Sequence, residues 1–251
     1  MKHLTIVTGA SRGMGFSMAE QLCGSDAVLL CISRSPSPEL DRIARERGGQ
    51  LSQWSADLGA AAPVALRVRE WLSAQRAADF ASATLINNAG VVGRMGPLDP
   101  LDADALLQCL RVDLEAPMLL TAAFLEATRS WTAARKILNI SSGLGRRAIA
   151  GGAMYCAAKA GLDHFSRCAA LDEAAHSKGA RIVSLAPGII DTDMQAELRA
   201  SDPDRFPGRD GFVQAKESGG LSSPAAAAQR VLAYLARPDF GHDTVADVRD
   251  A

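Results

Sequence analysis

Short apolar runs alternate with longer amphipathic segments along most of this chain. The apolar runs contain few charges, as expected for strands of a parallel sheet that is covered by helices on both faces. They are LTIVTG (4–9), AVLLCIS (27–33), LSQWSADL (51–58), ATLINNAG (83–90), KILNISS (136–142) and RIVSLAPG (181–188), and DTVADV (243–248) could add an edge strand. Helical patterns lie between them at about 14–24, 38–47, 60–77, 102–129, 153–177 and 223–237.

The regular alternation of strand and helix indicates βαβ units. It predicts an α/β fold in which residues 1–251 form a single Rossmann domain, a doubly wound parallel sheet of about seven strands flanked by helices. The stretch at about 188–222 shows neither pattern and contains Pro203, Pro207 and several glycines. It follows a strand end, the edge where open α/β sheets bind ligands, so we expect an irregular substrate lid there.

Charge and cysteine content narrow the possible partners and location. The formal net charge is −1 and basic residues are scattered, which favours neither nucleic acid nor a membrane surface as a partner. Five cysteines without C-x-x-C spacing argue against a disulfide framework and a metal site, and for a reducing compartment. The first residues lack a secretory-signal layout, and the apolar runs are too short to cross a bilayer. We therefore expect a cytoplasmic protein.

The segment TGASRGMG (8–15) follows the first strand and opens the first helix. Gly9, Gly13 and Gly15 allow a sharp turn and a close approach to a pyrophosphate, which the helix N-terminus would bind through its free N–H groups. A glycine-rich tight turn without a ligand is the alternative. The strand-turn-helix context favours a dinucleotide site.

The end of the second strand favours NADP(H) over NAD(H). NAD-binding domains place an acidic residue about 20 residues beyond the glycines to hold the ribose 2′-hydroxyl. Here Ser33 and Arg34 stand at that place. Arg34 could bind a 2′-phosphate in a bidentate manner, and Arg12 could add a second cation. Two solvated surface arginines are the alternative.

Tyr155 and Lys159 are four residues apart in GGAMYCAAKAGLDHF (151–165), so they share one face of an expected helix. A nearby ammonium lowers the pKa of a phenol, an effect that burial opposes. Ser142 ends the expected strand at 136–142, where the dinucleotide should lie. Two hydroxyls converging on one carbonyl beside a nicotinamide describe carbonyl reduction, with Tyr155 as the proton donor. A helix-surface pair and a strand-end cap are the alternatives.

These motifs resemble, in order and spacing, those of the short-chain dehydrogenase/reductase family over nearly the whole chain. The matching segments are TGASRGMG (8–15), NNAG (87–90), NISSG (139–143), YCAAK (155–159) and APGIIDT (186–192). The resemblance implies that Ser142, Tyr155 and Lys159 form the catalytic set. It also implies a homodimer or homotetramer that pairs through the helices at 102–129 and 153–175.

The cofactor site that the resemblance implies is built from the glycine loop, the ends of the next strands and the 187–192 turn. Asp57 and Asn88 would line the adenosine half, and Pro187–Thr192 would pack on the nicotinamide. The full set is Gly9, Ser11, Arg12, Gly13, Met14, Gly15, Ser33, Arg34, Asp57, Leu58, Asn88, Ala89, Gly90, Tyr155, Lys159, Pro187, Gly188, Ile190 and Thr192.

One position departs from the family pattern. The family often has an Asn in the fourth helix that supports a proton relay to the lysine, whereas LRVDLEAPM places Asp113 there. An ionised Asp cannot donate a hydrogen bond. Three interpretations stay open: a neighbour compensates, Asp113 is protonated, or the relay takes a different route.

A narrower set of segments resembles the sepiapterin reductase branch, which includes bacterial benzil reductases. These are ADLGA (56–60), LINNAG (85–90), YCAAKAGLDHF (155–165) and APGIIDTDMQAELR (186–199). Members of that branch anchor a pterin with an Asp near the C-terminus, and Asp247 looks like its equivalent, a surface carboxylate being the alternative.

The resemblance implies an NADPH-dependent reductase of a ketone, a vicinal dicarbonyl or a pterin side chain. Ser142, Tyr155 and Asp247 would then contact a small-molecule carbonyl substrate. A non-catalytic NADP(H)-binding regulator on the same fold is the main alternative. A nucleotide-sugar dehydratase or epimerase fits poorly, because those enzymes are usually longer and carry a separate substrate domain.

Overall fold

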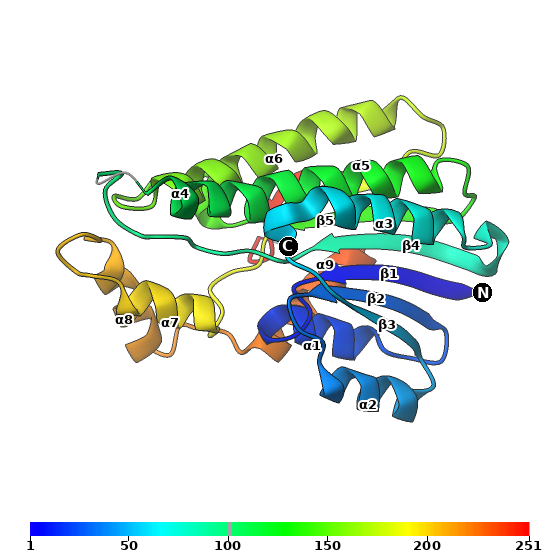
Figure 1. The fold of residues 1–251 in the computed structure, drawn as a ribbon, viewed down its shortest axis with the longest axis horizontal. Helices are drawn as coiled ribbons and strands as arrows, with labels where there is room; N and C mark the ends of the chain where they lie inside the picture. Colours follow the sequence, from blue (N-terminus) through cyan, green and yellow to red (C-terminus); the bar gives the residue numbers. More distant parts are fainter. Residues whose placement is uncertain (100–101, 251) are drawn as a thin grey trace.

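The expected apolar runs form neighbouring strands of one parallel sheet. The computed structural model describes residues 1–99 and 102–250, and in this part of the chain the sheet has seven strands in the order β3-β2-β1-β4-β5-β6-β7 (Figure 1). The strands are β1 (Lys2–Thr8), β2 (Ala27–Ser33), β3 (Gln50–Ser55), β4 (Phe80–Asn87), β5 (Ala134–Ile140), β6 (Arg181–Ala186) and β7 (Val245–Asp247). The expected edge strand at 243–248 is therefore present as β7.

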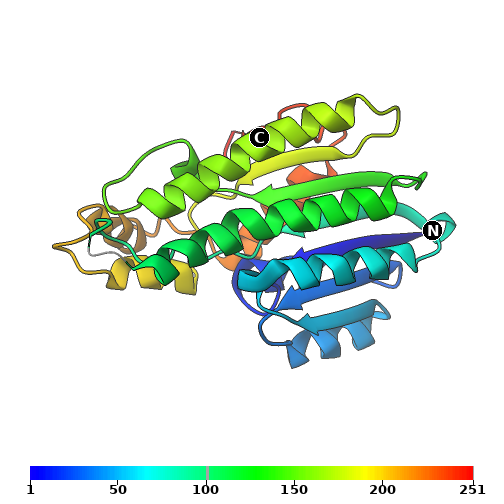
Figure 2. The same ribbon diagram turned by 45° about the horizontal axis from the view of Figure 1, so that its top comes forward.

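Helices cover both faces of this sheet, as in a Rossmann domain (Figures 1 and 2). One layer contains α1 (Gly13–Leu22), α2 (Pro38–Arg47) and α9 (Pro224–Ala236), and the other contains α3 (Ala61–Ser73), α4 (Ala103–Leu110), α5 (Ala116–Thr128) and α6 (Ala153–Ala174). Successive strand residues point to opposite faces. Leu85 accordingly packs into the α3 and α5 layer, and Ile86 packs into the α1 and α9 layer. The α/β fold is confirmed.

The expected helix at 102–129 is interrupted in its middle. A π-helical segment, η3 (Arg111–Glu115), separates α4 from α5. Pro117 lies in the first turn of α5 and has no N–H group to donate to the carbonyl of Asp113, four residues earlier. Single π-turns of this kind often occur at functional sites. The turn places the Asp113 side chain inside the protein, where it is fully buried.

The expectation that 188–222 is irregular is wrong. This segment contains two short helices, α7 (Asp193–Ala200) and α8 (Arg209–Glu217). The rings of Phe206 and Phe212 stack with their centroids 5.8 Å apart and join the two helices to one apolar cluster. Pro203 and Pro207 lie between the two helices, so these prolines indicate the short connection that joins them. Both helices lie beyond the carboxyl ends of the strands (Figures 1 and 2), and a role as a lid stays a prediction.

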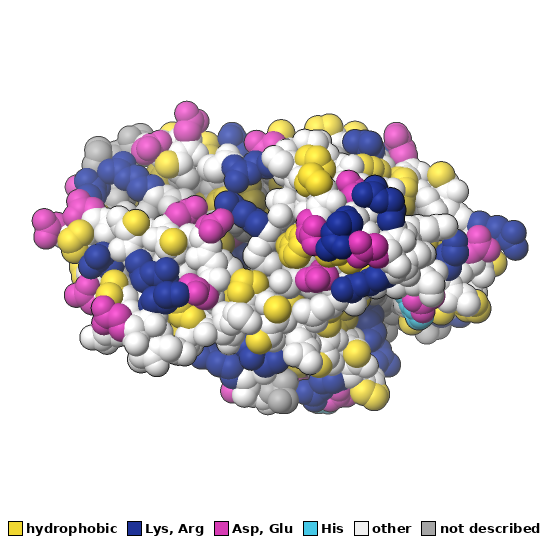
Figure 3. Space-filling model, turned by 90° about the horizontal axis from the view of Figure 1, so that it is seen from below, with side chains coloured by type: hydrophobic (Ala, Val, Ile, Leu, Met, Phe, Trp, Pro, Cys, Tyr) yellow, Lys and Arg dark blue, Asp and Glu magenta, His cyan; other side chains and the backbone are white. Residues whose placement is uncertain are grey.

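Charged side chains of both signs are interspersed on the face shown in Figure 3. Within residues 1–99 and 102–250, no helix has both the length and the apolar composition needed to span a membrane. Over the same residues, no group of three or more His, Cys, Asp or Glu side chains is arranged to hold a metal ion.

Gly15 stands where the start of α1 crosses the turn after β1. A Cβ atom added to Gly15 would lie 2.2 Å from the Gly9 carbonyl oxygen and 2.4 Å from the Asn88 side-chain nitrogen. That nitrogen donates to the Thr8 carbonyl oxygen at 2.9 Å. Neither neighbour can move without breaking the turn or its contact with β4.

We predict that Gly15→Ala lowers the free energy of unfolding by about 1–3 kcal/mol, as overpacking does elsewhere. Ala is otherwise the better helix former, so the sign of the change reports the close contact. Gly211→Ala is the matched control, because Gly211 is also helical and a Cβ there meets no atom within 4 Å. Denaturant unfolding of both variants checks this. Equal stability of Gly15→Ala and the parent protein would show that the turn has room to spare.

Candidate active site

The predicted site residues gather at the carboxyl ends of the central strands. Gly9 follows β1, Asn88 follows β4, Ser142 follows β5 and Pro187 follows β6. In the sheet, β2 and β3 lie on one side of β1, and β4 to β7 lie on the other side. The direction in which successive strands are added therefore reverses between β1 and β4. Open α/β sheets bind ligands in the crevice at such a switch point.

Thr8, at the end of β1, connects the glycine loop to β4. Its hydroxyl oxygen accepts hydrogen bonds from the backbone N–H groups of Asn88 at 2.9 Å and Ala89 at 3.0 Å. The Asn88 amide donates back to the Thr8 carbonyl. Asn88 therefore braces the glycine loop, and its expected contact with the adenosine half of a cofactor stays a prediction. Thr8 was not among the residues predicted to bind the cofactor, although it opens the TGASRGMG segment.

The first turn of α1 offers backbone donors to an anion. Its N-cap residue, Arg12, has no side-chain capping hydrogen bond, and the first turn carries no acidic residue. Gly13 has a left-handed backbone, with φ +57°. A Cβ atom added to Gly13 would lie 3.5 Å from the methyl group of Thr192, so the 187–192 turn lies directly over the loop. These features fit the pyrophosphate of a dinucleotide.

The two arginines expected to bind a 2′-phosphate differ in whether they already form an ion pair. The Ser33 hydroxyl donates to the Ser35 carbonyl, and no carboxylate of the described residues lies within ion-pair distance of Arg34. Arg12 instead forms an ion pair of 2.7 Å with Asp193 at the start of α7. These two residues are 181 positions apart, so local sequence patterns could not reveal the pair.

The other residues predicted to bind the cofactor lie in the turns that follow the neighbouring strands. Asp57 accepts a hydrogen bond from the Gly59 N–H at 2.8 Å, which fixes the turn that contains the buried Leu58. Met14 packs into the apolar layer under α1, next to Ser11 and Gly13 of the loop. Gly188 has a φ of +85°. Ile190 is buried and forms a bridge with Ser222, which holds the 187–192 turn against the start of α9.

A buried ion pair lies at the centre of the site. Lys159 is 4% exposed, and its ammonium lies 3.0 Å from the Asp113 carboxylate and donates to the Ile140 carbonyl oxygen at 3.0 Å. The other Asp113 oxygen accepts the Val91 N–H at 2.8 Å. A Cβ on Gly90 would lie 3.1 Å from the Asp113 carboxylate, so a larger residue at this position would crowd the pair.

The two buried partners shift each other's titration. Burial alone would lower the pKa of Lys159, but the Asp113 carboxylate and the Tyr155 phenol raise it, and the net pKa lies above its ordinary value. Burial raises the pKa of Asp113; Lys159 and the Val91 N–H oppose that rise, and the net pKa lies above its ordinary value. The Lys159 ammonium lies within ion-pair distance of one Asp113 oxygen, and the Val91 N–H donates to the other. Asp113 is thus placed to act as the counter-ion of Lys159.

Tyr155 lies beside this pair and is buried, with the Lys159 ammonium 5.6 Å from its ring centroid. Burial raises the pKa of Tyr155; Lys159 and a hydrogen bond with Ser142 lower it, whereas Asp113 raises it. The net pKa lies above the ordinary value, because burial is the largest of these effects. The expected lowering by Lys159 and the expected opposition by burial are both present.

Ser142 has two relations at once. Its hydroxyl oxygen accepts the Leu144 N–H at 3.2 Å and so caps η4 (Gly143–Gly145), and its interaction with Tyr155 lowers the pKa of that phenol. The strand-end cap that was the alternative to a catalytic role is therefore real. It does not exclude that role, because the capping oxygen only accepts and the hydroxyl can still donate its own hydrogen.

Apolar side chains pack around Tyr155. Leu144, Leu198 and Phe206 are buried in one cluster with Tyr155, and partly buried Ile149, Met154, Met194 and Phe212 pack against it. Helices α7 and α8 contribute Leu198, Met194 and Phe212 to this wall. The expected lid segment thus contributes to the surroundings of Tyr155.

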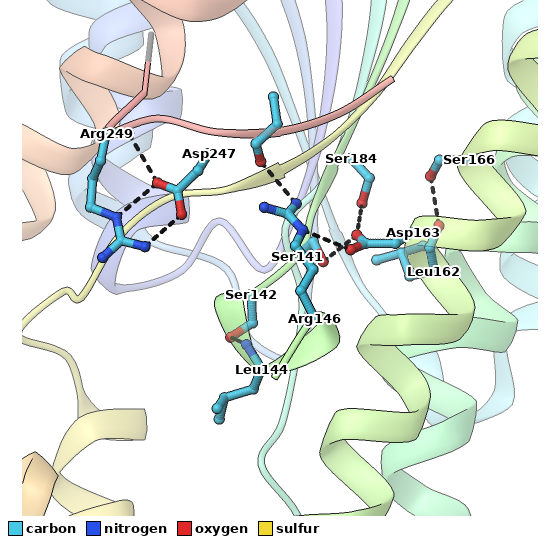
Figure 4. Close-up of polar contacts among 11 residues, drawn as sticks. Ser141, Ser142, Leu144, Arg146, Leu162, Asp163, Ser166, Ser184, Asp247 and Arg249 are labelled. Atoms are coloured by element: carbon cyan, nitrogen blue, oxygen red, sulfur yellow. Dashed lines mark hydrogen bonds and ion pairs between the residues drawn. The ribbon is translucent and has the colours of Figure 1, made fainter. Parts of the chain in front are cut away.

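Asp247, expected to anchor substrate, ends β7 in register with Ala186 of β6. Its carboxylate accepts two hydrogen bonds from the Arg249 guanidinium, at 2.8 and 2.6 Å (Figure 4). Arg249 lowers the pKa of Asp247 through these bonds. The carboxylate is therefore already paired, and a substrate contact would have to compete with Arg249.

Comparison with known proteins gives one family and several similar proteins. The family model described as short chain dehydrogenase matches residues 3–203. A benzil reductase ((S)-benzoin forming) from Bacillus cereus is 33% identical over 235 residues, covering 94% of each chain. A sepiapterin reductase from Xenopus tropicalis is 30% identical over 246 residues, covering 92% of this chain and 90% of the relative.

The fold also matches solved structures. A 3-oxoacyl-[acyl-carrier protein] reductase from Brucella melitensis, solved in complex with NAD, superposes with a TM-score of 0.79 at 24% identity. The alignment covers 99% of this chain and 96% of that structure. At this identity the likeness concerns the fold.

Proposed function

The chain belongs to the short-chain dehydrogenase family, and we propose that it is an NADPH-dependent carbonyl reductase acting on a ketone or a vicinal dicarbonyl. The observation that supports this proposal most strongly is the placement of Tyr155 next to both Ser142 and the Lys159 ammonium, each of which lowers the pKa of the phenol. Family membership makes the protein an oxidoreductase. The residues around Tyr155 support reduction of a carbonyl group.

Each residue of the site has its own role in the proposed reaction. The nicotinamide, when bound, supplies the hydride. Ser142 donates a hydrogen bond to the carbonyl oxygen and orients it, and Tyr155 gives that oxygen its proton. Lys159 stabilises the phenolate that remains. Asp113 holds the ammonium of Lys159 in place between itself and Ile140.

The residues at the end of β2 support the choice between NADP(H) and NAD(H). Arg34 is exposed there, whereas an acidic residue would repel a 2′-phosphate. Arg12, at the N-cap of α1, reaches Asp193 in this structure and is near enough to the loop to serve as a second cation. NADP(H) is therefore the proposed cofactor.

Two features favour an uncharged aromatic or aliphatic dicarbonyl over a pterin. The wall beside Tyr155 is apolar, formed by Leu144, Phe206 and their neighbours. The Asp247 carboxylate, which would anchor a pterin, is paired with Arg249. We propose substrates of the benzil type, in line with the Bacillus relative, and keep a pterin substrate as the second candidate because Asp247 is present.

Location and assembly stay predictions. The described cysteines are free, which agrees with a reducing cytoplasm. Leu107 and Met118 are 42% and 41% exposed on the α4 and α5 side of the molecule, where a homodimer or homotetramer would bury them. A non-catalytic NADP(H)-binding regulator stays the alternative function, and the intact arrangement of Tyr155 and Lys159 speaks against it.

Tyr155→Phe tests the proposed reaction. It should lower kcat by at least about 100-fold, because the proton donor is lost, and leave NADPH binding measurable. Tyr234→Phe is the matched control, since Tyr234 is the only other tyrosine of the chain and is equally buried, 8% exposed for each. NADPH oxidation is followed with benzil, isatin, small diketones and sepiapterin, and NADPH binding is measured separately.

Retention of most activity by Tyr155→Phe would refute the assignment. Parent protein that binds NADPH without turning over any member of the panel would favour the regulator instead.

Arg34→Asp tests the cofactor. Loss of a charge-assisted contact to the 2′-phosphate should reduce the ratio of kcat/KM for NADPH to that for NADH by about 10- to 100-fold. Arg45→Asp on α2 makes the same charge change at another exposed arginine and should leave the ratio unchanged. An unaltered ratio in Arg34→Asp would contradict the proposed NADPH preference.

Asp113→Asn tests the counter-ion. The Asp113 charge raises the pKa of Tyr155 and of Lys159, so its removal lowers both. Reduction needs protonated Tyr155 and charged Lys159, and the alkaline limb of the kcat/KM profile should therefore begin at lower pH in the variant. Asp102→Asn is the control, because Asp102 caps α4 and Asn caps equally well. Superimposable profiles of Asp113→Asn and the parent would show that the replacement of Asn by Asp is silent.

A further inference from the structure

A second buried carboxylate, Asp163, lies one helical turn beyond Lys159 on α6. The residue is 2% exposed. One of its oxygens accepts hydrogen bonds from the hydroxyls of Ser141 at 2.6 Å and Ser184 at 2.7 Å. The other accepts the Arg146 Nε–H at 3.1 Å (Figure 4). The proposed reaction assigns no role to this residue.

The partners of Asp163 flank the proposed carbonyl-orienting serine on both sides. Ser141 precedes Ser142 directly, and Arg146 follows the η4 turn that the Ser142 hydroxyl caps. The turn itself lies tightly on α6, since a Cβ on Gly145 would be 2.9 Å from the Lys159 backbone. The segment from Ser141 to Arg146 is therefore held at its two ends by one carboxylate and pressed at its middle against the same helix.

The same cluster extends to the strands beyond β5. Ser184 belongs to β6, and the Arg146 guanidinium also donates to the Ala246 carbonyl oxygen of β7 at 2.9 Å. Figure 4 shows Arg146 between Asp163 and the strand that carries Asp247. Asp163 thus fixes the end of β5 relative to β6 and, through Arg146, relative to β7.

We propose that Asp163 is a positioning residue that sets the direction of the Ser142 hydroxyl by binding Ser141 and Arg146. The inference rests on the proposed function, because it concerns the serine that orients the carbonyl. A misplacement of about 1 Å at a reacting group can lower the rate about 100-fold, so the anchoring of Ser142 has a measurable effect on turnover.

Asp163→Asn distinguishes between the contacts that the two carboxylate oxygens make. The Asn oxygen can still accept from Ser141 and Ser184, but its NH₂ group then faces the Arg146 Nε–H, donor against donor. The turn after Ser142 is released at one end while the side-chain volume is kept. We expect kcat and kcat/KM for the carbonyl substrate to fall together by about 10- to 100-fold, with NADPH affinity unchanged within about twofold.

Glu173→Gln is the matched control. Glu173 is also 2% exposed and lies on the same helix, but at its far end, where it pairs with Arg129 and Arg135 and accepts the Ala180 N–H. Its loss should lower stability without changing kcat per folded molecule. A general weakening of α6 would lower kcat in both variants, which would overturn the positioning role.

A double-mutant cycle with Ser142→Ala gives the sharper readout. If Asp163 acts through Ser142, then Asp163→Asn should cause little further loss of kcat in the Ser142→Ala enzyme. Additive losses, or full activity of Asp163→Asn alone, would overturn the inference. If Asp163→Asn does not fold, Arg146→Gln replaces it in the same cycle, because the Arg146 side chain is 32% exposed and its removal frees the same turn.

Failure of this inference is distinct from failure of the proposed function. Parent protein that reduces no carbonyl in the panel, or Ser142→Ala with full activity, would remove the proposed function itself. A different result would remove the positioning role alone: the parent is active, Ser142→Ala loses most of its activity, and Asp163→Asn causes its full loss of kcat in both backgrounds.

Discussion

The ion pair between Lys159 and Asp113 is the interaction on which the rest of the site depends. Two charges are removed from water here, which is unfavourable unless each finds several partners. The partners come from three separate elements: the Ile140 carbonyl at the end of β5, the Val91 N–H after β4, and the π-turn that contains Asp113. Gly90 leaves the space for them. The pair therefore fixes α6 against the sheet at the level where Tyr155 must act.

Helix α6 contacts the end of β5 through three side chains that are spaced four residues apart. Tyr155, Lys159 and Asp163 share one helix face, and each reaches a different point at the end of β5. Tyr155 meets Ser142, Lys159 binds the Ile140 carbonyl, and Asp163 binds the Ser141 hydroxyl. Three consecutive residues of one strand end are thus aligned by three turns of one helix. The proposed reaction uses the contact between Tyr155 and Ser142. The contacts that Lys159 and Asp163 make hold the helix and the strand end in place around it.

The sequence predicted what depends on periodicity and on the order of motifs, and it failed where distant residues meet. The apolar runs predicted all strands of the described sheet, and the motifs located Ser142, Tyr155 and Lys159 at one edge. Helices α7 and α8 were missed because they are short and are joined by a connection that contains Pro203 and Pro207. The ion pair of Arg12 with Asp193 and the binding of Arg146 to Asp163 depend on the tertiary fold. The balance between burial and the nearby ammonium, which decides the net direction of the Tyr155 pKa shift, also depends on that fold.

The charges around the site also bear on what it can accept. Asp113, Asp163 and Asp247 are each paired with a basic side chain: Lys159, Arg146 and Arg249 respectively. A charged group that bound to one of these side chains would have to separate its pair, beside the apolar cluster of Leu144 and Phe206. In the proposed reaction a neutral carbonyl compound needs no such exchange, since its oxygen requires only the hydroxyl donors of Ser142 and Tyr155. The pairing of the three carboxylates therefore supports the proposal of neutral ketones and dicarbonyls as substrates on grounds of charge, apart from the likeness to known reductases.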